Sequence, residues 1–258
     1  MRPDKEIIIH DIEPRDVKVW VCGDVHVGDA NCLLSEWQKW LQSIEDDPDS
    51  YVIFLGDLMN CTTRTSVGDV FEDLCSPKAQ QEIVHDSLYN LAKDGRILAM
   101  VMGNHEFRVG RETSIDPLYD VAVSLGVQDV YRKNFASVRV RMRKPNTGMK
   151  VAYDILAFHG ASDLKVRNMA NNIEGWDALC VGHIHDPKVD IPAHLSLSIN
   201  GKITLKQIVK VVGCSWVDYG GYGARNMFLP KAIARPQCLR LAWTTSNQQK
   251  FKKITVEW

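Results

Sequence analysis

Five apolar segments of this sequence end in the same way, and this repetition constrains the fold more than any other feature. Each segment resembles a buried strand and stops at glycine plus Asp, Asn or His, or at His plus glycine. The segments are VKVWVCGDVH, YVIFLGD, ILAMVMGNHE, DILAFHG and DALCVGHIH. Open α/β sheets carry their sites at the carboxyl ends of their strands. We therefore expect eight side chains to meet at one edge of the fold: Asp24, His26, Asp57, Asn104, His105, His159, His183 and His185.

Each strand end taken alone has an ordinary alternative. Gly-Asp after a strand is more often a turn than a ligand pair, and a single histidine is more often a hydrogen-bonded structural residue. Five of the eight histidines in the chain nevertheless fall in these strand ends. Repetition of this kind is hard to obtain by chance, so we favour a functional interpretation.

The residue types at the strand ends indicate metal chemistry. Asp, Asn and His together suit Mn, Fe, Zn or Mg, and the lack of cysteine in the set argues against a structural zinc finger. In the sequences DVH and HIH, two ligands separated by one residue can chelate a single ion through a turn. The whole set is too large for one tetrahedral ion and suits two, and two-metal sites commonly serve in-line displacement at phosphorus.

Between these strand ends the chain alternates strand-like and helix-like segments. The predicted strands are Ile7–Ile12, Val17–Cys22, Tyr51–Leu55, Arg96–Met102, Ala136–Arg143, Met149–Phe158 and Ala178–Val181. The predicted helices run from Asn31 to about Ile44, from Pro77 to about Lys93, from Pro117 to about Leu125 and near Leu164–Asn172. Mostly strand-like patterns follow Ile191. This mixed order predicts an α/β sandwich and not a purely parallel doubly wound sheet.

Composition narrows the class of protein. The 258 residues contain no repeat or flexible linker, so one domain spanning residues 1–258 is expected. A formal net charge of −1 argues against a surface built as a whole to bind nucleic acid. No segment approaches the roughly 18 apolar residues of a membrane span. The seven cysteines form no CxxC pair, which indicates reduced thiols and a cytoplasmic protein.

The strand-end motifs, in their order along the chain, resemble those of the calcineurin-like metallophosphoesterases. They are GDVHVGD, GDLMN, GNHE, His159-Gly160 and GHIH. The resemblance implies a four-layer αββα sandwich of two mixed sheets with a dinuclear metal centre. It also implies that Asp24, His26 and His185 hold the first ion, that Asp57 bridges both ions, and that Asn104, His159 and His183 hold the second. His105 would act as general acid or stabilise charge on the phosphoryl group, and a metal-bound hydroxide would be the nucleophile.

Asn60 departs from the family pattern. In the protein-phosphatase branch an Asp stands here and hydrogen-bonds the catalytic histidine, and in the branch resembling double-strand-break repair nucleases the residue is typically His. The sequence therefore predicts that Asn60 orients His105 without adding a charge. The paired histidines of GHIH fit the phosphodiesterase and nuclease-like branches better than the protein phosphatases.

Loops beside the strand ends supply candidate substrate contacts. Arg64, Arg108 and Arg111 are placed to meet a phosphate, although solvated loop arginines are an equal alternative. The aromatic, Gly/Pro-rich segment Asp218–Pro236 either completes a substrate pocket or forms a long hairpin loop. It and the TSVGD stretch are similar to segments of phosphoesterases carried by phages and prophages.

One further pattern concerns charge. In SVRVRMRK, the three arginines Arg139, Arg141 and Arg143 alternate with apolar residues. This arginine stripe fits a nucleic-acid groove, but an edge strand that is protected from aggregation by charge is the favoured interpretation.

The function expected from these features is hydrolysis of a phosphoester with two divalent metal ions, with Mn²⁺ the first choice in vitro and Fe, Zn or Mg as alternatives. A phosphodiester of a nucleotide or nucleic acid is the favoured substrate. Two alternatives stay open: a phosphomonoesterase, including a phosphoprotein phosphatase, and a non-catalytic scaffold of the same fold. The scaffold is disfavoured because every ligand type is present.

Overall fold

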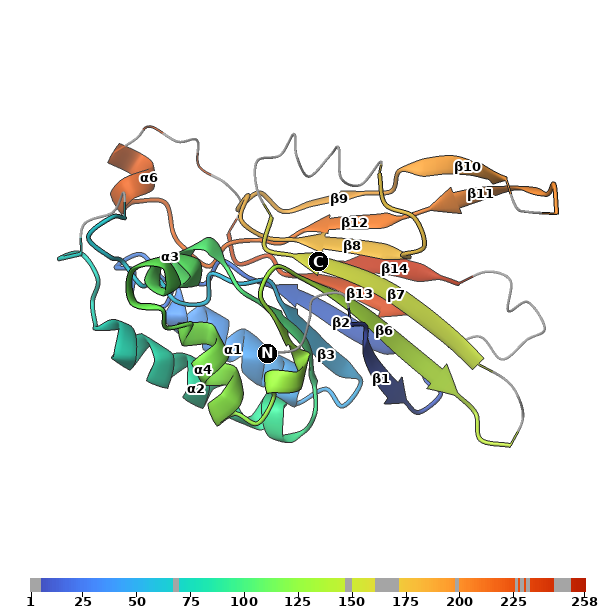
Figure 1. The fold of residues 1–258 in the computed structure, drawn as a ribbon, viewed down its shortest axis with the longest axis horizontal. Coiled ribbons are helices and arrows are strands. Elements are labelled where there is room, and N and C mark those ends of the chain that lie inside the picture. The colour runs from blue at the N-terminus through green and yellow to red at the C-terminus, as the bar shows by residue number, and fades with distance from the viewer. Residues whose placement is uncertain are drawn as a thin grey trace.

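Two mixed sheets of six strands form the centre of the molecule (Figure 1). The computed structural model describes residues 6–66, 70–146, 150–160, 172–197, 200–225, 227, 230, 233–243 and 252–258. Sheet A contains, in spatial order, β1 (Ile8–Ile12), β6 (Phe135–Arg143), β7 (Lys150–Phe158), β8 (Ala178–Val181), β12 (Val209–Val212) and β9 (Lys188–Asp190). Sheet B contains β14 (Ile254–Glu257), β13 (Gln237–Leu241), β2 (Val17–Cys22), β3 (Ser50–Phe54), β4 (Ile97–Val101) and β5 (Tyr131–Arg132).

The two sheets pack face to face around an aliphatic core. Val19, Val21 and Leu55 from the side of sheet B share one buried cluster with Val140 and Ile155 of sheet A. Alternation along β6 produces this contact, because every second side chain of a strand points to the same face. The apolar half of each alternating segment therefore fixes which face of sheet A turns inward.

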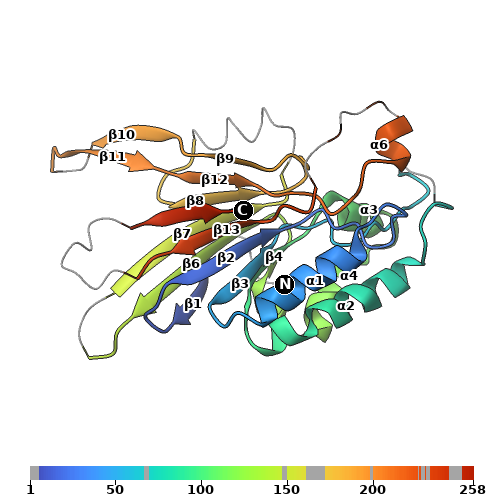
Figure 2. The same ribbon diagram turned by 180° about the vertical axis from the view of Figure 1, so that it is seen from behind.

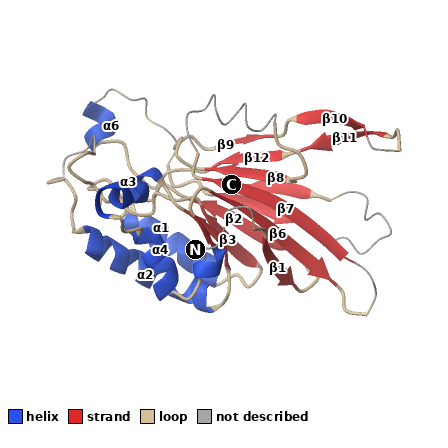
Figure 3. Cartoon of the chain, viewed as in Figure 1, coloured by secondary structure: helices blue, strands red, loops and turns tan. Residues whose placement is uncertain are grey.

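Helices cover the outer face of sheet B (Figures 1, 2 and 3). They are α1 (Leu34–Glu45), α2 (Pro77–Lys93) and α4 (Pro117–Ser124). A second buried cluster joins Trp37 and Leu88 of these helices to Phe54 and Met100 of the sheet. Ser76 caps α2 by accepting a hydrogen bond from the Ala79 amide, as the Ser-Pro start predicted.

Most predicted elements are confirmed, and two helices, α3 and the short α6 (Gly221–Arg225), were not predicted. Residues 104–113 form α3 (Asn104–Thr113), where the sequence predicted a loop. Its charged sequence lacks an apolar stripe, and its N-cap is a glycine. The helix starts there because the Glu106 carboxylate accepts the Gly103 amide, a contact that depends on tertiary position.

Two mixed sheets with helices are the expected fold class. The fourth layer of the predicted αββα sandwich depends on the segment near Leu164–Asn172, and residues 161–171 lie outside the described part of the chain. Within the described ranges, a small cluster of Leu156, Leu179 and Val181 packs with Ile173 and Trp176 on sheet A.

The expectation that β6 is an edge strand was wrong. β1 pairs with β6 in parallel and β7 pairs with it on the other side, so β6 lies inside sheet A. An acidic residue stands directly opposite two arginines of the stripe: Asp154 opposite Arg139, and Asp11 opposite Arg141. The missing information was the parallel partner, since a strand's own alternation does not show how many neighbours it has.

Three further elements complete the described structure: the 3₁₀ turn η1 (Gln128–Val130), the short helix α6 (Gly221–Arg225), and a separate hairpin of β10 (Ala193–Leu197) and β11 (Ile203–Gln207). The hairpin projects away from the helices (Figure 2), with Leu195, Leu197, Ile203 and Leu205 exposed. All seven cysteines are free thiols, as expected. No helix among the described residues is both long and apolar enough to cross a membrane.

Candidate metal centre

The five predicted strand ends meet at one edge of the sandwich. β2, β3 and β4 run parallel in sheet B, and β7 and β8 run parallel in sheet A, so their carboxyl ends share a side. The loops that follow are bonded to one another. The Asp24 amide donates to the Gly56 carbonyl at 3.0 Å, and the Val25 and His26 amides donate to the Asp57 carbonyl at 2.9 and 3.0 Å. The convergence expected from the sequence is therefore present.

Two glycines permit the closest approach of the strand ends. Gly56 has φ of +87°, and a Cβ there would lie 2.3 Å from the Gly103 nitrogen. A Cβ on Gly103 would lie 2.1 Å from Oδ1 of Asp57. Any side chain at these positions would separate the loops that carry Asp57 and Asn104, so the glycines belong to the site's geometry.

Three overlapping groups of side chains offer metal-ligating atoms within 4.8 Å of one another: Asp24 with His26 and His185, His26 with Asp57 and His105, and Asp57 with His159 and His183. We call the seven predicted metal-binding residues the ligand cluster: Asp24, His26, Asp57, Asn104, His159, His183 and His185. His26 and Asp57 each belong to two groups, so the arrangement is continuous rather than two separate sites.

The first group contains two imidazoles in contact. His185 Nε2 lies 3.0 Å from Asp24 Oδ1 and 3.4 Å from His26 Nε2. Two ring nitrogens at this distance share one proton at most, whereas a cation would be attracted to both lone pairs. Asp24 is fully buried, and its Oδ2 accepts the His183 amide at 2.8 Å, which orients the carboxylate.

The group that contains Asp57, His159 and His183 is built around His159. Its Nδ1 donates to the Leu55 carbonyl at 2.7 Å, which leaves Nε2 facing the cluster. Nε2 lies 2.8 Å from Asn104 Oδ1 and 3.2 Å from Asp57 Oδ2. A hydrogen bond from one ring nitrogen to a carbonyl is the usual way to fix the tautomer of a metal-binding histidine.

Backbone strain is concentrated in the same residues. Five members of the ligand cluster are non-glycine residues with φ in the left-handed region: Asp24 (53°), His26 (54°), Asp57 (50°), His183 (68°) and His185 (56°). Such conformations cost on the order of 1–3 kcal/mol each and cluster at functional sites. The strain turns each side chain sharply out of its strand toward the shared edge.

The surroundings shift the pKa values of the histidines in the site in opposite directions. Burial and the neighbouring His105 lower the pKa of His26 to about 3. Burial opposes protonation of His159, but the Asp57 carboxylate outweighs it and raises its pKa to about 10. Burial likewise opposes ionisation of Asp57, yet the charges of His159 and His105 hold its pKa well below the usual range. Without a cation, therefore, a proton on His159 balances the Asp57 carboxylate.

Glu106, part of the GNHE motif, supports the loop that carries Asp57, a contact that the sequence did not indicate. It is fully buried and accepts amides from Asp57, Leu58, Met59 and Gly103 at 2.8–3.1 Å. These bonds fix the loop that carries Asp57. Burial and the nearby Asp57 raise the pKa of Glu106 to about 7, against the effect of those amides. Only the fold reveals the role, because the four amides come from two loops.

His105 lies beside the ligand cluster, with Nε2 3.9 Å from Asp57 Oδ2. Its Nδ1 donates to the backbone carbonyl of Asn60 at 2.6 Å. The Asn60 side chain, expected to orient His105, instead donates to Asp73 at 2.7 Å. The contact between the two positions is therefore made by the main chain, which any residue at position 60 supplies.

The predicted substrate arginines differ in their positions. Arg108 lies one turn after His105 on α3, and Nε and Nη2 of its guanidinium are buried without a hydrogen-bond partner in the described part of the chain. Its charge, after the larger effect of burial, contributes to lowering the pKa of His105, which shows that the two groups are close. Arg64 and Arg111 are exposed, and no described contact connects either with the cluster.

Residues of the segment after β12 hydrogen-bond to the backbone of Asp24 in the ligand cluster. Ser215 Oγ and the Trp216 amide both donate to the Asp24 carbonyl, at 3.1 and 3.0 Å. Arg225 of α6 forms a bidentate ion pair with Glu72, in which both N–O distances are 2.6 Å. The predicted tail segment therefore adjoins the loops after β2 and β3, although residues 226, 228–229 and 231–232 lie outside the description.

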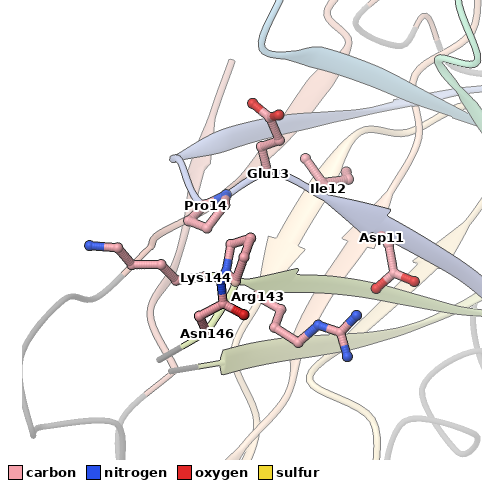
Figure 4. Close-up of a pocket in the computed structure, with 8 residues that line it drawn as sticks. Asp11, Ile12, Glu13, Pro14, Arg143, Lys144 and Asn146 are labelled. Atoms are coloured by element: carbon pink, nitrogen blue, oxygen red, sulfur yellow. The ribbon is translucent and has the colours of Figure 1, made fainter. Parts of the chain in front are cut away.

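A cleft at the other end of the sandwich is separate from this centre. It has a volume of about 660 Å³ and is lined by residues 11–14 and 143–146 (Figure 4). These residues follow β1 and β6, whose carboxyl ends point opposite to that of β7. None of the candidate ligands lines it, so the ligand cluster carries the functional argument.

Two mixed sheets with Asp, Asn and His gathered at one edge define a metallohydrolase-type centre. The sequence model described as calcineurin-like phosphoesterase matches residues 17–187, and the chain belongs to that family. Its members typically hold a dinuclear metal centre, and membership supports phosphoester hydrolysis by this chain.

Solved structures with related architecture are distant in sequence. They include NAD nucleotidase (NadN) of Haemophilus influenzae, with 12% identity, TM-score 0.44, and coverage of 93% of this chain and 49% of that one. This chain therefore spans about half the length of that structure. They also include the calcineurin-like phosphoesterase YfkN of Bacillus subtilis, with 13% identity, TM-score 0.40 and coverage of 94% and 90%. A third is GAP50, the anchor in the inner membrane complex of Plasmodium, with 10% identity, TM-score 0.41 and coverage of 95% and 90%. No curated protein matches the sequence.

Proposed function

We propose that this protein is a two-metal phosphodiesterase that hydrolyses a phosphodiester of a nucleotide or nucleic acid. The observation that carries the proposal is the continuous set of ligand groups joined through Asp57, with His105 and Arg108 beside it. A scaffold would not need ligand atoms facing one another, strained backbone at five of the ligands, and an arginine with two buried nitrogens that lack a hydrogen-bond partner among the described residues.

The residues fit the metal ions that the family implies. Asp24, His26 and His185 form the first ligand set, and Asn104, His159 and His183 form the second, with Asp57 between them. The close approach of His26 Nε2 and His185 Nε2 is favourable toward a cation and poor without one. Oxygen and imidazole donors suit Mn, Fe or Zn, and we propose Mn²⁺ as the first ion to test.

When bound, such ions supply Lewis acidity that polarises the phosphoryl group and activates water. The protein's own residues position the substrate and supply the proton for the leaving oxygen. His105 donates from Nδ1 to the Asn60 carbonyl and presents Nε2 to the site. As an imidazolium it would give the Nε2 proton to the leaving oxygen and become the neutral imidazole that keeps its proton on Nδ1. Arg108 supplies two N–H donors for a phosphate oxygen, which would satisfy its buried nitrogens.

The charge near His105 favours a diester. A diester carries one negative charge on the transferring phosphoryl group and a monoester carries up to two. Among the described residues, Arg108 is a positively charged side chain close enough to lower the pKa of His105, and the side chain of Asn60 adds no charge there. The nucleotide class follows from the family resemblance of the GHIH motif. Single-domain organisation and a cytoplasmic location belong to the same proposal.

Parallel assays test the proposal. The Mn²⁺-loaded protein is assayed with bis-p-nitrophenyl phosphate, p-nitrophenyl phosphate and single-stranded DNA, with the His105→Ala variant as control. We expect diester turnover to exceed monoester turnover. The control should lose most of its activity on single-stranded DNA, whose leaving oxygen needs a proton, and less on the two p-nitrophenyl substrates. Turnover of the monoester alone would establish the phosphomonoesterase instead. No turnover, with no metal detected by elemental analysis, would establish the scaffold.

A further inference from the structure

The bond that orients His105 ends on a peptide unit held from two directions. That unit joins Asn60 to Cys61. Its carbonyl accepts His105 Nδ1–H at 2.6 Å, and its N–H, on Cys61, donates to Gln80 Oε1 at 2.8 Å. Cys61 has φ of 44°, in the left-handed region. A peptide in this conformation is strained for a non-glycine residue and persists only where neighbouring groups determine it.

Asp73 connects the side chain of Asn60 with Gln80, the residue that accepts the Cys61 amide. Its Oδ1 accepts the Asn60 Nδ2 at 2.7 Å and the Thr62 hydroxyl at 2.7 Å. Its Oδ2 accepts the Gln80 Nε2 at 3.0 Å and the Thr62 amide at 3.2 Å. All four partners are donors, and the two oxygens of a carboxylate can accept from all four.

Gln80 anchors this network to a rigid element. It is fully buried on α2, and its Nε2 also donates to the Cys75 carbonyl at 3.0 Å. The path from helix α2 therefore runs through Gln80 and Asp73 to Asn60, and from there to the imidazole on α3. His105 itself has no contact with Asp73 among the described bonds, and the described hydrogen bonds connect the two residues through the Asn60–Cys61 peptide.

We propose that Asp73 is a positioning residue for His105: it fixes the Asn60–Cys61 peptide so that the carbonyl of Asn60 holds the imidazole ready to donate from Nε2. The inference rests on the proposed function, in which His105 protonates the leaving oxygen. In this chain, a carboxylate remote in sequence acts through an asparagine, where the related protein phosphatases place an Asp directly against the histidine.

The leaving group distinguishes positioning from a general structural effect. General-acid assistance matters most when the leaving oxygen is a poor leaving group and little when it is p-nitrophenolate. The assay compares Asp73→Asn with wild type, using Mn²⁺-loaded protein and two diesters, one leaving p-nitrophenolate and one leaving an aliphatic alcohol. We expect kcat to fall about tenfold for the alcohol and less than about twofold for p-nitrophenolate, with KM and metal content unchanged.

A reciprocal exchange provides the rescue. In Asn60→Asp the new carboxylate faces Asp73, and in Asp73→Asn a donor faces Asn60, so each single variant disrupts the pair. The double variant N60D/D73N again pairs one donor with one acceptor, and the amide oxygen introduced at position 73 can still accept from Gln80. We expect the double variant to recover most of the alcohol-leaving activity. Asp47→Asn serves as matched control, because Asp47 accepts bonds from Lys18 and Ser50 in a turn at the other end of β3.

A spectroscopic measurement keeps the test independent of turnover. The Nδ1–H of His105 should give a proton resonance in the metal-free wild type and in the double variant, and exchange too fast to observe in Asp73→Asn. Equal losses on both substrates, an unchanged resonance, or failure of the double variant to recover would overturn the positioning role. If His105→Ala itself shows no dependence on the leaving group, the proposed function of His105 fails and not only the role of Asp73.

Discussion

Two charged patterns were equally regular in the sequence, and the structure separates them by whether their charges are satisfied. In the arginine stripe, Arg139 contacts Asp154 at 2.6 Å and Arg141 contacts Asp11 at 2.5 Å, each directly across the sheet. In the ligand cluster, by contrast, two imidazole nitrogens approach within 3.4 Å, and the backbone is strained at five ligands. Imidazole nitrogens that face one another on a strained backbone indicate a site that a cation completes, whereas charges that pair with opposite charges on neighbouring strands indicate a structural role.

The largest expected effect is at the centre of the ligand cluster. Asp57→Asn removes the charge shared between the two groups of ligands, and should lower both metal content and kcat, the latter by about 10³-fold or more. Elemental analysis and diester turnover measure the two effects. Retention of two ions per chain in this variant would contradict the bridging position of Asp57.

For a diester with an alcohol leaving group, His105→Ala should lower kcat by about 10²–10⁴-fold, because it removes the proton donor. Metal content should stay at the wild-type level, since His105 is assigned outside the ligand set although it lies near His26 and Asp57. Loss of an ion on this substitution would move His105 into the ligand cluster and would change its proposed role.

Glu106→Gln tests the support behind Asp57. The amide has one acceptor oxygen instead of two for the four backbone donors, so the Asp57 loop should loosen. We expect metal affinity to fall about 10–100-fold, as for other groups that support ligands. Isothermal titration with Mn²⁺ measures the change. Unchanged affinity would mean that the Asp57 loop does not depend on this carboxylate.

Metal binding should also depend on pH in a defined direction. The raised pKa of His159, about 10, means that the metal-free protein holds a proton there at neutral pH. Binding must release this proton, so apparent affinity should rise up to about tenfold per pH unit below that pKa. The same proton stabilises the folded metal-free protein below the unfolded pKa of about 6.5, and this stability is lost as pH rises toward 10. Affinity that is independent of pH would contradict the Asp57–His159 pairing.

The smallest effect is expected in the arginine stripe. Arg139→Gln breaks an ion pair whose arginine is 42% exposed, so the free energy of unfolding should change by about 1 kcal/mol or less. Diester turnover and DNA binding should match wild type. A marked loss of DNA affinity would restore the nucleic-acid groove that the sequence left open and would weaken the distinction between the two patterns.

Much of the candidate site could be predicted because its information is local. Each ligand stands at the end of a strand, and strand ends in parallel sheets meet at one edge. The α3 helix, the role of Glu106 and the partner of Asn60 could not be predicted in the same way. Each depends on a contact between segments far apart in sequence: Glu106 accepts amides around Asp57, and Asn60 donates to a residue in a separate turn.

By itself, the sequence determined the alternation of strands and helices and the residues that gather at one edge of the sandwich, whereas the two mixed sheets were implied by the family resemblance. Periodicity and glycine positions carry that information within short segments. Only the tertiary structure decided that β6 lies inside sheet A, that Arg139 and Arg141 of the arginine stripe are paired, and that the main chain of Asn60 rather than its side chain meets His105. Those outcomes depend on which strand or loop becomes a neighbour, and a segment's own pattern does not encode its neighbours.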